Sequence, residues 1–151
     1  MATAAGRDLR ILVADDDAMV REAYRAFFAR TDGFELVGEA TDGDEAFDAY
    51  VRLRPDCVLM DLQMPGMGGI EATRTICADP ALAATRVLIL TTFDDDADIL
   101  ESIRVGASGY LLKDTPAAEL RRAVHAIAEG ENFLSPQITR KLMAHVAASP
   151  P

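Results

Sequence analysis

The sequence has 151 residues, half of them hydrophobic, and a formal net charge of −10 from 15 basic and 25 acidic residues. This length suits one compact domain, and the hydrophobic share excludes a disordered chain. The acidic excess argues against a nucleic-acid-binding surface, which needs clustered Lys and Arg; it is compatible with bound metal cations, a basic protein partner or simple solubility.

Short apolar runs alternate with stretches of helical periodicity along the chain. In chain order, we predict strands at 9–14, 34–40, 57–60, 86–90 and 109–112, each followed by a helix, at about 18–30, 44–54, 69–78, 94–106 and 115–130 respectively. In the tail at 131–151, Ser135 and Pro136 read as the start of one further short helix.

Five such βα units predict the fold class. The strands are continuous runs rich in Val, Ile and Leu, which indicates burial on both faces and therefore a parallel sheet with helices on each side. We expect an α/β fold, a flavodoxin-like, doubly wound (βα)5 sheet with strand order 2-1-3-4-5.

The cysteines and the N-terminus bear on the cellular compartment. Cys57 and Cys77 form no CxxC motif and no disulfide framework, which favours a reducing cytoplasm, and we expect both to be small core residues. The N-terminus lacks the apolar run of a signal peptide, and no apolar run approaches the ~18 residues of a membrane span. We therefore expect a cytoplasmic protein with no membrane partner.

Polar residues follow four of the five predicted strands. Asp15 and Asp16 follow the first strand, Asp61 the third, Thr91 the fourth and Lys113 the fifth. In open α/β sheets, ligands bind outside the carboxyl ends of the strands. Crowded carboxylates without a nearby His or Cys favour Mg²⁺, and a Lys and a Thr are suited to hold a phosphoryl group. The pattern predicts a phosphoryl-transfer site with Asp61 as the nucleophile.

Other residues near these positions have simpler explanations. Asp17 is expected to cap the first helix, and the acidic run 94–96 to cap the fourth and to compensate its dipole. Met64 and Met67 are expected to be packing residues rather than a ligand pair.

These motifs, in this order, identify a family resemblance. The acidic pair in ILVADDD, the segment DLQMPGMGG at 61–69, Thr91 in VLILTTF and Lys113 in GYLLKDT resemble the receiver domain of bacterial two-component response regulators over roughly residues 8–130. The details of TTF and LLKDT are similar to the branch whose output is a LuxR-type helix-turn-helix. The chain departs from the broad family pattern at Asp114, where a Pro usually follows the Lys.

The resemblance implies roles for individual residues. Asp61 is implied to accept a phosphoryl group from a sensor histidine kinase. Mg²⁺, for which Mn²⁺ can substitute, is implied to bind Asp16, Asp61 and the backbone carbonyl of Gln63, and to bind Asp15 through water. Lys113 is implied to pair with the phosphoryl group.

The resemblance also implies a phosphorylation-activated signalling switch. Thr91 would move toward the phosphoryl group, and Tyr110 would turn inward behind it and remodel the surface around the fourth helix and fifth strand. Gln63 and Phe93 flank the site and are candidates for tuning the lifetime of the phosphoryl group. Apart from its own phosphorylation and slow dephosphorylation, the domain would not be an enzyme.

The organisation of the chain follows from the same resemblance. Residues 1–7 are expected to be a disordered N-terminus, 8–130 the receiver domain and 131–151 a linker or extra helix toward a DNA-binding output domain that this sequence lacks. DNA would be reached only through that domain. Phosphorylation commonly drives homodimerisation in this branch.

Three other functions remain as alternatives. A phosphorylation-independent receiver could serve only for dimerisation. A Mg²⁺-dependent phosphohydrolase of the dehalogenase type would need an acid two residues after the nucleophile, where this chain has Gln63. A flavin- or nucleotide-binding domain would need a phosphate cradle after the first strand, where DDDA would repel phosphate.

Overall fold

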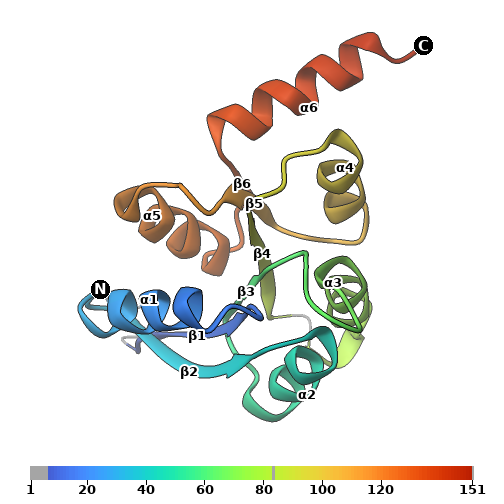
Figure 1. The fold of residues 1–151 in the computed structure, drawn as a ribbon. Helices are drawn as coiled ribbons and strands as arrows, with labels where there is room; N and C mark the ends of the chain where they lie inside the picture. Colours follow the sequence, from blue (N-terminus) through green and yellow to red (C-terminus); the bar gives the residue numbers. More distant parts are fainter. Residues whose placement is uncertain (1–6, 83, 151) are drawn as a thin grey trace.

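The apolar runs of the sequence form one parallel sheet (Figure 1). The computed structural model of the protein describes residues 7–82 and 84–150. Its strands are β1 (Leu9–Ala14), β2 (Phe34–Ala40), β3 (Cys57–Met60), β4 (Arg86–Thr91), β5 (Gly109–Leu112) and β6 (Phe133–Leu134). Their order is β2-β1-β3-β4-β5-β6, which confirms the predicted order 2-1-3-4-5 and adds one short strand beside β5.

Helices cover both faces of this sheet (Figure 1). They are α1 (Ala18–Ala29), α2 (Gly43–Leu53), α3 (Gly69–Cys77), α4 (Asp96–Arg104), α5 (Ala117–Ala128) and α6 (Pro136–Ala148), with a 3-10 turn at Pro80–Leu82. One core layer joins the sheet to α1 and α5, and the other joins it to α2, α3 and α4. Successive strand residues alternate between the layers, as Ile11 and Leu12 do in β1, so the sheet is buried on both sides.

The helix caps agree with the sequence in most places. The Asp17 side chain caps α1 by accepting a hydrogen bond from the Met19 N–H at 2.9 Å. The short helix predicted after Ser135 is α6, and the Ser135 hydroxyl accepts from the Ile138 N–H at 3.3 Å. Asp95 occupies the cap position of α4 but accepts no cap hydrogen bond, so the predicted cap is not formed, while the acidic residues still favour the helix dipole.

Two further predictions concern the N-terminal segment and the cysteines. Except for Arg7, the predicted disordered segment 1–7 lies outside the described residues; Arg7 itself pairs with Asp56 at 2.7 Å. Cys57 is buried in the core as expected, but the prediction for Cys77 was wrong, because this residue is exposed. The buried side of α3 ends at Ile76, and one further residue turns the helix about 100° away from the sheet.

Candidate functional site

The carboxyl ends of β1 and β3 bring three acidic residues together. The two strands are parallel neighbours, and the Asp61 N–H donates to the Ala14 carbonyl at 2.9 Å. Asp15 and Asp61 are buried, whereas Asp16 is exposed. One carboxylate oxygen from each of these three acids lies within 4.8 Å of the other two. The acid cluster, as we call Asp15, Asp16 and Asp61, is therefore a set of hard oxygen ligands that could hold a metal ion.

Lys113 joins this cluster from the end of β5. Its Nζ lies 2.7 Å from Asp15 Oδ2 and 3.5 Å from Asp61 Oδ2, and its side chain is mostly buried. The Lys113 N–H donates to the Thr91 carbonyl at 2.8 Å, which anchors the lysine to the end of β4. Four side chains that the sequence places after β1, β3 and β5 thus meet at one edge of the sheet.

The charged groups at the acid cluster shift one another's pKa values. Burial raises the pKa of the Asp61 carboxyl, and the Asp15 carboxylate raises it further, while Lys113 and the Gln63 backbone N–H act in the opposite direction. Burial alone would lower the pKa of the Lys113 ammonium, but Asp15 and Asp61 outweigh burial and leave that pKa raised. Lys113 is therefore charged at neutral pH, and the cluster keeps excess negative charge that a cation would neutralise.

Arg21 on α1 supports the cluster and was missed by the sequence analysis. Its Nη1 donates to the Asp15 carbonyl at 2.8 Å, and its Nε lies 3.3 Å from a carboxylate oxygen of Glu39 on β2. The Asp15 Oδ1 in turn accepts from the Asp17 N–H at 2.9 Å. A cation in the first turns of a helix opposes the helix dipole, and this was the available sign that Arg21 has a specific partner.

Thr91, Phe93 and Tyr110 form a second connected group beside the cluster. Thr91 is fully buried, and its Oγ1 accepts from the Phe93 N–H at 3.3 Å. The Tyr110 hydroxyl donates to the Phe93 carbonyl at 2.6 Å, and the Tyr110 ring is buried. Phe93 itself is 39% exposed. The aromatic side chain predicted to turn inward thus already lies inside the fold.

The turn after Asp61 contains two further residues considered in the sequence, Gln63 and Met64. Gln63 is exposed, and Met64 packs in the core as expected. Gly69 begins α3 so close to Asp61 that a Cβ there would overlap the Asp61 carbonyl oxygen. Glycine is required at this position because the backbone of α3 meets the backbone of the turn after Asp61.

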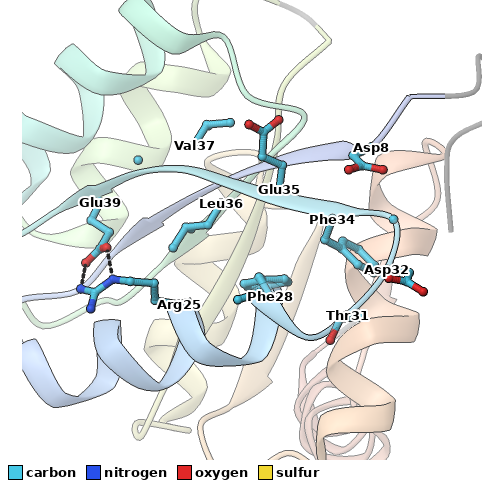
Figure 2. A pocket seen from close by; sticks show the side chains of 13 residues that line it. Asp8, Arg25, Phe28, Thr31, Asp32, Phe34, Glu35, Leu36, Val37 and Glu39 are labelled. Carbon is cyan, nitrogen blue, oxygen red and sulfur yellow. Dashed lines mark hydrogen bonds and ion pairs between the residues drawn. The ribbon is translucent and has the colours of Figure 1, made fainter.

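A hollow of about 880 Å³ lies elsewhere, along β2 and the end of α1 (Figure 2). We call it the β2 hollow. Phe28 and Phe34 pack in it with ring centroids 5.7 Å apart, and Arg25 pairs with Glu39 at 2.8 Å. None of the residues that line it belongs to the acid cluster, so the β2 hollow and the acid cluster are separate features.

Comparison with known proteins agrees with this geometry. Residues 11–125 match the response regulator receiver domain family. The chain is 40% identical over 141 residues to the transcriptional regulatory protein LiaR of Bacillus subtilis (strain 168), covering 93% of this chain and 66% of that protein. It is 38% identical over 136 residues to the oxygen regulatory protein NreC of Staphylococcus aureus (strain JH9), covering 89% of this chain and 62% of that protein.

A solved structure is similar along its whole length. The LuxR-family two-component response regulator from Aurantimonas sp. SI85-9A1 superposes with a TM-score of 0.85 at 41% identity, covering 93% of this chain and 99% of that one. Across the part of the chain that the structure describes, no helix is long and apolar enough to cross a membrane. The curated relatives are regulators rather than enzymes, and this chain spans only 66% and 62% of their length. The chain belongs to the response regulator receiver domain family, with close relatives of the LuxR type.

Proposed function

We propose that the protein is a phosphorylation-activated switch in which Asp61 accepts a phosphoryl group from a sensor histidine kinase. One observation carries the proposal: a buried carboxylate, Asp61, lies beside two further acids and a half-buried lysine at the end of the sheet. We further propose that the switch acts in the cytoplasm, dimerises on phosphorylation and controls a DNA-binding output domain, since its relatives are transcriptional regulators.

The residues present fit a magnesium ion. Asp16 and Asp61 would bind it directly, Asp15 would bind it through water, and the Gln63 carbonyl would complete the protein ligands. Three carboxylates with no His or Cys among them form a hard-oxygen site, which suits Mg²⁺ or Mn²⁺. When bound, the ion supplies charge neutralisation for the phosphoryl oxygens and for the acid cluster.

Asp61 would act as the nucleophile. One Oδ forms a bond to phosphorus, while the bond between phosphorus and the donor's leaving atom breaks and the leaving atom keeps the electron pair. Lys113, already 3.5 Å from Asp61 Oδ2, would pair with the incoming phosphoryl oxygens. Asp15 holds Lys113 at 2.7 Å and so keeps the ammonium beside the reacting carboxylate.

Thr91 and Tyr110 would carry the signal away from Asp61. The Thr91 Oγ1 now accepts a hydrogen bond from the Phe93 N–H at 3.3 Å. Thr91 would give up this bond when its side chain moves and its hydroxyl donates to a phosphoryl oxygen. That exchange moves the segment after β4, to which the Tyr110 hydroxyl is bonded. A local charge would thereby bias a two-state element.

The proposal is tested by intact mass after incubation with acetyl phosphate, with and without Mg²⁺, beside an Asp61→Asn variant. We expect one added phosphoryl group that requires both Mg²⁺ and Asp61. Robust labelling of Asp61→Asn would contradict the assignment of the nucleophile. No labelling under any condition would favour a receiver that serves only for dimerisation, and turnover of a small phosphate ester would favour a phosphohydrolase.

A further inference from the structure

The C-terminal segment 133–148, which comprises β6 and α6, packs against the receiver fold. In Figure 1, α6 lies above α4, and the two helices are in contact. β6 extends the sheet by pairing with β5, with Leu134 beside Tyr110. Ile138, the buried residue of α6, is completely inaccessible and belongs to the same apolar cluster as Ile99 and Tyr110.

Polar contacts align α6 on the segment that leads into α4. Gln137 Nε2 donates to Asp94 Oδ2 at 3.4 Å, and Lys141 Nζ lies 3.7 Å from the same oxygen. His145 Nδ1 lies 3.6 Å from Asp96 Oδ2. These contacts are long and partly exposed, so each contributes little, and the burial of Ile138 is the main source of docking free energy.

The docked segment touches the proposed switch at two points. Asp94, which Gln137 and Lys141 contact, directly follows Phe93, whose N–H and carbonyl are bonded to Thr91 and Tyr110. The C-terminal segment also adjoins Tyr110 itself, since Leu134 is its partner in the sheet and Ile138 belongs to the same buried apolar cluster. Because this interior is close-packed, an outward movement of the Tyr110 ring would disturb the packing that holds the C-terminal segment in place.

We propose that α6 is the intramolecular partner of the α4–β5 face and holds Tyr110 inward, so that α6 docking and phosphorylation of Asp61 favour the same conformation. This inference rests on the proposed function, in which the phosphorylated state has Tyr110 inside. Coupling between two binding events is reciprocal. Binding of a phosphoryl group or its mimic at Asp61 must then strengthen the docking of α6, and undocking of α6 must lower the affinity of the Asp61 site by the same factor.

The first half of this prediction is tested by hydrogen exchange in the whole chain. Beryllofluoride with Mg²⁺ serves as the phosphoryl mimic, because it binds reversibly. We expect the amides of residues 137–148 to exchange at least about five-fold more slowly when the mimic is bound, which is the lower end of ordinary coupling between sites. Unchanged or faster exchange of these amides in the bound state would overturn the inference.

The second half is tested with variants of α6. Ile138→Asp places a charge in the apolar cluster and should undock α6, lowering the affinity for beryllofluoride, measured by ¹⁹F NMR, by the same factor. Met143→Gln is the matched control, because Met143 lies on the same helix but is 67% exposed. If circular dichroism shows that Ile138→Asp is unfolded, Ile138→Ala and Lys141→Gln replace it, with smaller losses expected.

The two proposals fail in different ways. If the wild-type chain binds no beryllofluoride, the proposed function falls and the inference falls with it. If the mimic binds and Ile138→Asp, or its replacement, keeps full affinity, only the inference is overturned.

Discussion

The acid cluster and the β2 hollow differ in how their charged groups are satisfied. In the β2 hollow, Arg25 pairs with Glu39, and the Phe28 and Phe34 rings are among the side chains that line it (Figure 2). In the acid cluster, Lys113 is the close cationic side chain shared by Asp15 and Asp61. The hollow has volume, and the other acids that line it are exposed to solvent: Asp8, Asp32 and Glu35. In the cluster, by contrast, Asp15 and Asp61 are buried.

Under the function proposed above, the volume of a hollow is a poor guide to the functional site of this molecule. Apolar pockets mark sites for drug-sized ligands, which must bury most of their surface. A metal ion and a phosphoryl group are small and are recognised by charge and hydrogen bonding instead. Unbalanced, partly buried charge at the strand ends is therefore the more informative feature.

The largest stability effect is expected at the glycines of the two regions. Gly69→Ala should lower the free energy of unfolding by about 3 kcal/mol, because the new Cβ would meet the backbone of Asp61 and Leu62, which cannot yield locally. Gly38→Ala in the β2 hollow should cost about 1 kcal/mol or less, because the obstacle is the flexible end of the Leu53 side chain. Urea denaturation measures both; equal losses would contradict this difference.

Magnesium should stabilise the protein through the acid cluster alone. At a concentration 100-fold above its dissociation constant, Mg²⁺ should raise the free energy of unfolding by about 2.7 kcal/mol. Asp16→Asn removes one ligand and should abolish most of this gain. Glu35→Gln, an exposed carboxylate at the β2 hollow, should leave it intact. Thermal denaturation with and without Mg²⁺ gives the comparison, and a gain that survives Asp16→Asn would count against the proposed ligands.

The two regions should respond oppositely when a carboxylate is neutralised without metal. Burial and Asp15 raise the pKa of Asp61, so its ionised form opposes folding, and Asp61→Asn should stabilise by about 1 kcal/mol at neutral pH. Arg25 lowers the pKa of Glu39, so its ionised form favours folding, and Glu39→Gln should destabilise by about 0.5–1 kcal/mol.

The pH dependence of these two effects follows from the same shifts. Because the pKa of Asp61 is raised in the folded state, its contribution is favourable at low pH and is lost as pH rises through that pKa. Because the pKa of Glu39 is lowered, its contribution is present above the unfolded value and lost as pH falls. Both variants should therefore approach the wild type near pH ~4 or below, from opposite sides, in urea denaturation with a chelator present. Differences of the same sign would contradict this account.

Much of the fold and the site was predictable because each rests on local patterns. Apolar runs gave the five main strands, and residues placed directly after them gave Asp15, Asp61 and Lys113, since strand ends of a parallel sheet share one edge. β6 was not predicted, because a two-residue strand has no periodicity of its own and depends on pairing with β5. The role of Arg21 was also not predicted, because it depends on contacts with residues distant in the sequence, such as Glu39 on β2.

Arg21 gives the smallest expected effect and links the two regions, since Glu39 contacts both Arg21 and Arg25. Loss of either arginine removes a positive charge near the acid cluster, which by itself should raise Mg²⁺ affinity slightly. Arg21 additionally holds the Asp15 carbonyl at 2.8 Å, so Arg21→Met also frees the loop that carries two of the proposed ligands. One hydrogen bond to a charged group is enough to outweigh the distant charge effect.

We therefore expect Arg21→Met to lower Mg²⁺ affinity about three-fold. Arg25→Met, the matched control, should leave the affinity unchanged or slightly higher, because the Arg25 side chain is 55% exposed and its polar contacts are with Glu39. Calorimetric titration with Mg²⁺ measures both variants. If Arg21→Met lowers the Mg²⁺ affinity and Arg25→Met does not, Arg21 acts through the position of the Asp15 loop. If both variants raise the Mg²⁺ affinity, Arg21 acts only through its charge.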